Sequence, residues 1–235
     1  MLKVEHLNGG YGVIQVLWDI SMEVEAGEIT ALVGSNGMGK TTLMKTIAGN
    51  LPAMGGRISY RGNDITHVPQ NVRVGTGISM IPEGRQLYAA MTVEDTVLMG
   101  AYTRNDRSGI RADLEWVYSV FPRLRERRKQ LSGTLSGGEA QMCAIARGLM
   151  SKPALLLIDE LSLGLAPVIV DQLIRILTGI HREKGLTLLL VDQDVQTALE
   201  ISKRAYVIDN GRIVMEKESG LLKDDPEIKK AYLGL

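Results

Sequence analysis

The sequence predicts an α/β protein in which a largely parallel sheet is covered by helices. Residues 154–158 and 186–191 are apolar runs with the length of strands buried on both faces. A third run, residues 29–33, ends in a glycine-rich loop. Segments with apolar residues at helical spacing lie between these runs. Apolar strands that alternate with such helices are typical of a sheet with helices on both faces.

The N-terminal part is predicted to be rich in β-structure. Residues 13–24 alternate in part between apolar and polar side chains, and residues 29–33 form the first buried strand. After the glycine-rich loop, residues 42–48 carry apolar side chains at helical spacing, namely Leu43, Met44 and Ile47. Pro52 and the Gly55-Gly56 pair are expected to end that helix.

A mostly helical insertion is expected between about residue 82 and residue 153. Thr92 stands three residues before Asp95, which is typical of a helix start. Residues 137–150 form another predicted helix, which Pro153 closes. Residues 111–128 are strongly charged, with an apolar stripe of Leu114, Val117, Tyr118 and Phe121. We therefore expect one domain, residues 1–235, with a core of residues 1–82 and 154–235 and a helical subdomain of about residues 83–153.

The C-terminal part returns to alternating strands and helices. Pro167 suits the first turn of a helix whose apolar stripe includes Leu173 and Leu177. The sequence Asp209-Asn210-Gly211 separates two strand-like runs, and this combination predicts a β-hairpin.

Composition narrows the classes of function. Lys and Arg total 27, as do Asp and Glu, and this balance predicts no binding to nucleic acid. Cys143 is the single cysteine, so the chain has no internal disulfide and no cysteine-rich zinc site. No apolar stretch approaches the ~20 residues that cross a bilayer, and the N-terminus lacks the apolar core of a signal peptide. We therefore expect membrane association only through a partner.

The motif that decides the chemistry is the loop of residues 34–41, which fits G-x-x-x-x-G-K-[ST]. Its glycines allow successive backbone N–H groups to point at phosphate oxygens, and the following helix adds its positive end. Lys40 would meet the β- and γ-phosphates, and Thr41 would ligate Mg²⁺. The predicted nucleotide ligands here are Gly34, Ser35, Asn36, Gly37, Met38, Gly39, Lys40, Thr41 and Thr42.

A second acidic site follows the apolar run of residues 154–158. Asp159 is placed to hold Mg²⁺, and Glu160 could accept a proton from the water that attacks the γ-phosphate. Strand ends at this edge of an α/β sheet are where ligands bind. A solvated acidic turn is the alternative, and the phosphate loop in the same chain argues against it.

The pentapeptide Leu135-Ser136-Gly137-Gly138-Glu139 lies between these two motifs. Serine and two glycines at a helix start can bind an anion, although an ordinary serine-capped helix has the same pattern. In this order the three motifs resemble those of the ATP-binding cassette (ABC) family, whose signature is LSGGE or LSGGQ. The resemblance covers the whole chain. It implies a P-loop NTPase core with an N-terminal antiparallel β-subdomain and an inserted helical subdomain.

The resemblance also implies partners and further site residues. Tyr11 matches the family aromatic that stacks on adenine, although a lone tyrosine is more often a packing residue. Residues 162–165 match the D-loop, which contacts the opposite subunit. Two cassettes close head to tail around ATP, so that Ser136, Gly137 and Gly138 of one subunit face the phosphate loop of the other. A cassette of this kind hydrolyses ATP on the inner face of the cell membrane and drives transmembrane permease subunits.

Three positions depart from the general family pattern. Glu83 replaces a glutamine and is expected near Mg²⁺, Gln193 replaces the switch histidine, and Leu161 stands where proline is usual. The first two changes resemble the shorter ATPase subunits of high-affinity branched-chain amino-acid importers, which work with a substrate-binding protein. The relatives that import urea or short amides remain an alternative, as do an exporter, a DNA-repair or chromosome ATPase and a regulatory ATPase. A homodimer and a heterodimer are equally compatible with the sequence.

Overall fold

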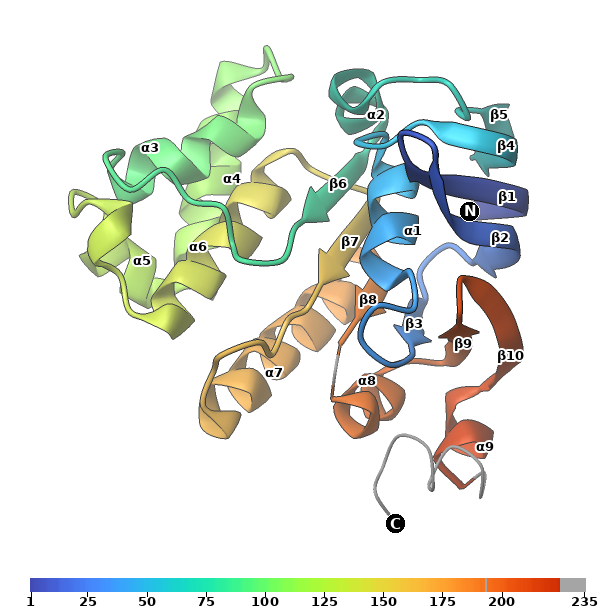
Figure 1. The fold of residues 1–235 in the computed structure, drawn as a ribbon. Coiled ribbons are helices and arrows are strands. Elements are labelled where there is room, and N and C mark those ends of the chain that lie inside the picture. Colours follow the sequence, from blue (N-terminus) through green and yellow to red (C-terminus); the bar gives the residue numbers. More distant parts are fainter. Residues whose placement is uncertain (193, 225–235) are drawn as a thin grey trace.

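Two sheets form the framework of the molecule (Figure 1). The computed structural model describes residues 1–192 and 194–224. The first sheet is antiparallel with the order β2-β1-β4-β5, and the second has the order β10-β9-β3-β8-β7-β6. The strands are β1 (Leu2–Tyr11), β2 (Ile14–Val24), β3 (Ile29–Val33), β4 (Ala53–Tyr60), β5 (Asn63–Asp64), β6 (Ile78–Ile81), β7 (Leu155–Asp159), β8 (Thr187–Val191), β9 (Arg204–Asp209) and β10 (Arg212–Glu218).

The helices lie between the two sheets, on the second sheet and to one side of it (Figure 1). None of them is long and apolar enough, within residues 1–192 and 194–224, to cross a membrane. The α-helices are α1 (Lys40–Ala48), α2 (Gln70–Thr76), α3 (Val93–Leu98), α4 (Arg107–Val120), α5 (Pro122–Glu126), α6 (Gly137–Met150), α7 (Pro167–Lys184), α8 (Val195–Ile201) and α9 (Ser219–Asp224).

The second sheet is parallel apart from the β9–β10 hairpin. Every residue of β3, β7 and β8 is buried, as the three apolar runs in the sequence predict. Because parallel strands end at the same edge, the loops after β3 and β7 meet there. The predicted hairpin is confirmed, with Asn210 and Gly211 both at positive φ in its two-residue turn.

Two apolar cores cover the two faces of the parallel sheet. One lies toward the antiparallel sheet and takes in Leu43, Met44 and Ile47 of α1, so the predicted helical spacing is confirmed. The other lies toward α3, α4, α6, α7 and α8. Alternate residues of β3 divide between them, with Leu32 in the first and Ala31 and Val33 in the second. Helix α1 therefore begins at the edge of the sheet with its buried face fixed.

Helices α3 to α6, which we call the arm (residues 93–150), lie beside the sheets next to β6 and β7 (Figure 1). Thr92 is the N-cap of α3 and accepts a hydrogen bond from the Asp95 backbone, as its sequence pattern predicts. The boundaries of the helical subdomain near residues 83 and 153 stay a prediction.

The apolar stripe expected within residues 111–128 lies on α4 and at the junction that follows it. Helix α4 ends at Val120 and α5 begins at Pro122, with Phe121 between them at φ −122°. Pro122 has no N–H to continue the ladder of α4, and it suits the first turn of a new helix. Phe121 stays buried with Val117 and Tyr118, and the half-buried Leu114 packs against the same core.

Strand β4 differs from the sequence expectation, and helix α2 was not predicted. The Gly55-Gly56 pair, expected only to end a helix, lies inside β4, which pairs with β1 through a register shift near these glycines. Gly56 has φ 82°, and a Cβ there would lie 2.3 Å from the carbonyl oxygen of His6, so the bulge requires glycine. Helix α2 has a short and mostly polar sequence, and no periodic pattern indicates it.

Candidate nucleotide site

The loop of residues 34–41 joins β3 to α1 and is shaped by close backbone contacts. A Cβ on Gly34 would lie 2.3 Å from the carbonyl oxygen of Ile208, so any other residue would displace the neighbouring strand β9. Gly39 is the N-cap of α1 with φ 102°, and no side chain caps the helix. The first N–H groups of α1 therefore keep their hydrogen-bonding capacity for an anion.

Lys40 lies inside this loop. Its Nζ donates to the backbone oxygens of Gly34 at 2.7 Å and of Ser35 at 2.9 Å, which closes the loop around the ammonium group. Burial lowers the pKa of Lys40, while the nearby Glu160 and Asp159 act in the opposite direction. The ammonium group is thus held where the predicted phosphates would come, at the buried edge of the sheet.

Thr41 links the loop to the end of β7. Its Oγ1 donates to Oδ1 of Asp159 at 3.2 Å, across 118 residues of sequence. Burial raises the pKa of Asp159, and the hydrogen bond from Thr41 opposes that shift. The two groups that the sequence assigns to Mg²⁺ through different motifs therefore lie within hydrogen-bonding distance.

Glu160 follows directly and lies in an unusual backbone conformation. Its φ is 60°, in the left-handed region, and its N–H donates to the oxygen of Val191 at 2.9 Å. The residue is only 7% exposed, and burial raises the pKa of its carboxyl group to about 7 although Lys40 lowers it. A carboxyl group that titrates near neutral pH is suited to accept a proton from water.

Two carboxylate oxygens at this site have no partner among the described residues. They are Oδ2 of Asp159 and Oε2 of Glu160, and both are buried. Buried polar atoms are almost always hydrogen-bonded or bound to an ion. This pair of oxygens, beside Thr41, therefore fits a hydrated cation and a reacting water.

The site opens into a pocket of about 430 Å³. Tyr11 forms one wall. The residue is 45% exposed, and its hydroxyl lies 3.5 Å from Oγ1 of Thr42. Val16 also lines the pocket and was not predicted, because a valine within an alternating strand carries no distinguishing signal. The lining residues are Tyr11, Val16, Asn36, Gly37, Gly39, Lys40, Thr41, Thr42, Glu83 and Glu160.

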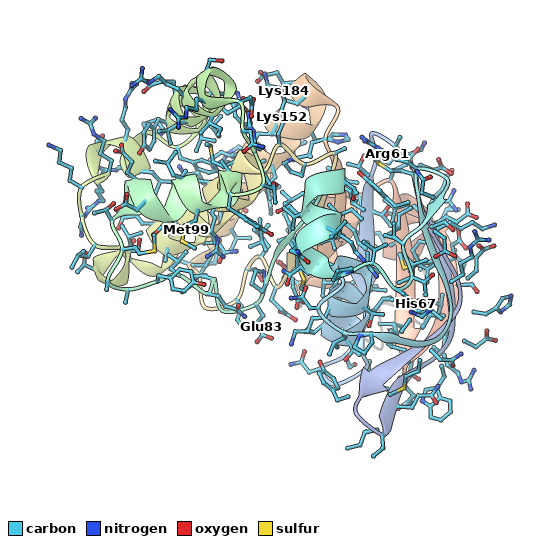
Figure 2. All side chains as sticks on the ribbon, turned by 90° about the horizontal axis from the view of Figure 1, so that it is seen from above. Arg61, His67, Glu83, Met99, Lys152 and Lys184 are labelled. Atoms are coloured by element: carbon cyan, nitrogen blue, oxygen red, sulfur yellow. The ribbon has the colours of Figure 1, made fainter. Side chains whose placement is uncertain are left out.

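Some predicted ligands lie next to this pocket and not in its wall. Gly34 and Ser35 contribute the oxygens that hold Lys40. Met38 packs against the β9–β10 hairpin, and its backbone oxygen accepts from Gly211 at 3.1 Å. Glu83 is exposed and reaches the pocket from the loop after β6, where Figure 2 shows it between the arm and the core. Gln193 lies outside the described residues.

The signature segment does not enter this pocket. Ser136 is the N-cap of α6, where its Oγ accepts from the N–H of Glu139 and its own N–H donates to the Glu139 carboxylate at 3.0 Å. A Cβ on Gly138 would lie 2.9 Å from Ile169 of α7. Ser136, Gly137 and Gly138 are thus held on the arm against the start of α7, and the chain itself does not bring them to Lys40.

Asp192 is a site residue that the sequence reasoning missed. It is 1% exposed and accepts hydrogen bonds from the N–H and hydroxyl of Ser162, at the start of the D-loop, and from the N–H of Asp194. The signal was present, since an acidic residue follows the apolar strand β8 just as Asp159 closes β7.

Leu161 stands where the family usually has a proline. It is 1% exposed, in the apolar core that lies toward the arm and α7, so burial anchors the turn that lacks the proline.

Comparisons with known proteins agree with this geometry. The family model described as ABC transporter matches residues 17–162, more than half of the chain. The chain belongs to the ABC transporter family. The predicted fold is confirmed, and the chain is the ATP-binding, ATP-hydrolysing component of such a transporter.

Full-length relatives of this ABC protein are also found. It is 44% identical, over all of both chains, to the high-affinity branched-chain amino acid transport ATP-binding protein BraG of Pseudomonas aeruginosa. It is 35% identical to an Archaeoglobus fulgidus protein named "Probable branched-chain amino acid transport ATP-binding protein LivF", covering 100% of this chain and 99% of the relative. A solved nucleotide-free cassette from an ABC transporter superposes with a TM-score of 0.88 at 24% identity, covering 100% and 99% of the two chains.

Proposed function

We propose that this chain binds and hydrolyses ATP to drive an importer of branched-chain amino acids. The observation that carries the catalytic part is the meeting of Lys40, Thr41, Asp159 and Glu160 at one edge of the parallel sheet. The identity of the transported molecule is supported by the names of the two full-length relatives. Glu83 and Gln193, which replace the family's usual glutamine and histidine, support it from the sequence.

Each residue at the site has a separate role in this proposal. Tyr11 stacks on adenine at the mouth of the pocket, and the N–H groups at the start of α1 receive the phosphates. Lys40 exchanges its backbone acceptors for the β- and γ-phosphate oxygens. Glu160 takes a proton from the attacking water, and Gln193 donates an amide hydrogen to the γ-phosphate.

The residues present fit Mg²⁺ bound together with a nucleotide. Among the described residues, no three His, Cys, Asp or Glu side chains cluster closely enough to hold a metal by themselves. Mg²⁺ characteristically binds one or two carboxylates and otherwise takes phosphate oxygens and water. Thr41 and Asp159 would hold it with Glu83 nearby, and its charge would offset the phosphates as the terminal bond breaks.

The signature segment is proposed to act on a second subunit. Cassettes of this family dimerise and work with transmembrane permeases. Ser136, Gly137 and Gly138 lie outside the nucleotide pocket of their own chain, which supports a head-to-tail dimer in which they cover the partner's ATP. The second cassette is another copy of this chain or a related ATPase subunit.

A groove between arm and core is proposed to receive the permease. It has a volume of about 460 Å³ and is bordered by α2, β6, the loop after β6, the turn that follows α3 (residues 99–102) and α6. Tyr88, Met99 and Tyr102 stand exposed along it, and Met99 lies on the arm side of Glu83 in Figure 2. Exposed aromatic residues and methionine in a groove suit an apolar partner helix. The chain would then lie on the cytoplasmic face of the membrane, and a substrate-binding protein would deliver the amino acid to the permease.

The hydrolytic part is tested with two substitutions in the purified chain. Lys40→Ala should abolish MgATP binding, because it removes the cation that faces the phosphates. Glu160→Gln should keep binding and lose turnover by about 10²-fold or more, because an amide cannot accept the proton. ATP affinity is measured by calorimetry and turnover by phosphate release. Near-normal turnover of Glu160→Gln would contradict the assignment of the base.

The transport part is tested after reconstitution with the permease subunits and the substrate-binding protein that this proposal requires. Leucine, isoleucine and valine should each stimulate ATP hydrolysis and enter the vesicles in the presence of ATP. Urea and acetamide serve as comparison substrates, since importers of small amides are the nearest alternative. Stimulation by an amide and by no branched-chain amino acid would replace the proposed substrate while leaving the ATPase assignment in place.

A further inference from the structure

The loop that carries Glu83 has a strained backbone, and a side chain of helix α6 holds it in that conformation. We call residues 82–86, between β6 and the arm, the Glu83 loop. Within it Arg85 and Gln86 have φ values of 65° and 45°, which residues other than glycine rarely adopt. Arg147 of α6 donates to the backbone oxygen of Gln86 at 2.7 Å and to that of Arg85 at 3.0 Å. A residue of the signature helix therefore fixes the backbone of this loop.

The Arg85 side chain makes a second set of contacts, which join the Glu83 loop to α6 and to the D-loop. Its Nε donates to Oε1 of Gln141 on α6 at 3.1 Å, and Gln141 is 3% exposed. Its second terminal nitrogen donates to the backbone oxygen of Leu163, in the D-loop, at 3.1 Å. Both terminal nitrogens also lie 3.7 Å from the position of a Cβ on Gly137. The guanidinium of Arg85 thus contacts both the signature helix (α6) and the D-loop, and the backbone of Arg85 is part of the Glu83 loop.

The D-loop continues this connection back to the nucleotide edge of the sheet. Ser162 is hydrogen-bonded to the buried Asp192, which follows β8 and stands next to the position of the predicted phosphate sensor, Gln193. At its other end the Glu83 loop places Glu83 in the wall of the nucleotide pocket. The contacts run without interruption from the pocket, through Arg85, to the segment expected to serve the partner's ATP.

We propose that Arg85 is a positioning residue that links the nucleotide pocket of one subunit to its own signature helix and D-loop, and so couples the two ATP sites of the dimer. The inference rests on the head-to-tail dimer proposed above. A planar fork with fixed donor directions can serve Gln141 and the Leu163 oxygen together, whereas a lysine ammonium at the end of a flexible stem cannot reproduce that geometry. Arg85 does not line the nucleotide pocket, so its loss should spare ATP affinity.

The test measures steady-state ATP hydrolysis against MgATP concentration for the full-length protein. Arg85→Ala should lower kcat about 10-fold and bring the Hill coefficient from its wild-type value toward 1. Arg85→Lys should recover little of either. The dissociation constant for MgATP, measured in the Glu160→Gln background at low protein concentration, should change less than about two-fold. Arg123→Ala, at an exposed arginine on α5, is the matched control and should leave all three quantities unchanged.

Gln141→Leu provides an independent variant that keeps Arg85 and the Arg147 contacts. It should lower the Hill coefficient in the same direction, and the double variant should be no worse than Arg85→Ala alone, because both changes break one connection. Additive losses would overturn the proposal, as would a wild-type Hill coefficient in Arg85→Ala or a loss of ATP affinity that matches the loss of kcat. A wild-type protein that neither binds nor hydrolyses MgATP would instead refute the proposed function.

Discussion

The buried position of Glu160 makes the free energy of unfolding depend on pH. Burial raises its pKa from 4.5 to about 7, so between these values the folded chain binds a proton that the unfolded chain releases. Stability contributed by this group is therefore present below about pH 4.5 and is lost as the pH rises through about 7. Asp159, whose pKa burial also raises, acts in the same direction. In the protein without metal and nucleotide, this edge of the sheet is thus least stable at alkaline pH.

Glu160→Gln should remove that dependence, since the amide carries no charge at any pH. In buffer with a chelator and no nucleotide, the variant should melt higher than the wild type by several degrees at about pH 8 and by almost nothing at about pH 5. Thermal unfolding at both pH values measures this. Glu25→Gln, at an exposed position, is the matched control. An equal change in melting temperature at both pH values would contradict the assignment.

Gln193 carries a second prediction at this scale, although it lies outside the described residues. Helix α8 is capped by Asp194, which accepts from the N–H of Thr197 at 3.1 Å, so a capping role is already filled at the neighbouring position. Gln193→Leu should lose most turnover and keep ATP binding, because leucine has similar bulk but no donor. Gln193→His should stay active and gain a step in its pH–rate profile between about pH 6 and 7. Wild-type turnover in Gln193→Leu would remove this residue from the site.

How far the sequence predicts the structure depends on the distance over which the information is encoded. The strand, glycine-rich loop and helix around residues 29–48 and the β9–β10 hairpin are encoded by local patterns, and the structure confirms both arrangements. Strand β4 was not predicted, because glycines such as Gly55 and Gly56 are typical of chain breaks. Pairing with β1 holds these two residues in a bulge, and that contact is not visible in the local sequence. The role of Arg85 depends on contacts 56 and 78 residues away, which no single-sequence pattern reveals.

At the scale of elements, Arg73 of α2 holds the C-terminal end of α1. It is 2% exposed, and one of its terminal nitrogens donates to the backbone oxygens of Thr46 at 2.9 Å and of Ile47 at 2.6 Å, in the last turn of α1. The other nitrogens bond the backbone oxygens of Val68 and Thr66. Burial, with no acidic partner among residues 1–192 and 194–224, lowers the pKa of Arg73 to about 10, and the side chain still stays charged at neutral pH. A cation at this end also complements the dipole of α1.

Arg73→Met should destabilise the protein by about 2 kcal/mol, because several buried carbonyl oxygens lose their donor while the cost of burying the charge is relieved. Urea unfolding measures the change in the free energy of unfolding. Arg182→Met, at an exposed position near the end of α7, should change it by less than about 0.5 kcal/mol. Equal stabilities of the two variants would show that Arg73 does not hold the end of α1.

At the scale of the whole molecule, two features lie where the arm meets the rest of the chain, and they have different tasks. One is the junction at Arg85, which joins the Glu83 loop to α6 and the D-loop. The other is the groove beside it, which stays open and presents Tyr88 and Tyr102 to solvent, 55% and 64% exposed. Arg147 contributes to both, since it borders the groove and holds the backbone of the Glu83 loop. A partner that fills the groove would therefore press on the same loop that reaches the nucleotide pocket.

This arrangement predicts that permease binding and ATP hydrolysis can be separated by mutation. The double change Tyr88→Ala and Tyr102→Ala should reduce co-purification with the permeases by about 10-fold or more, because it removes the two large exposed aromatic residues of the groove. The ATPase activity of the isolated chain should stay within about two-fold of wild type, since neither tyrosine lines the nucleotide pocket. Leu221→Ala on α9, where the leucine is as exposed as Tyr102 at 64%, is the control. Unchanged co-purification of the double variant would place the permease contact elsewhere on the surface.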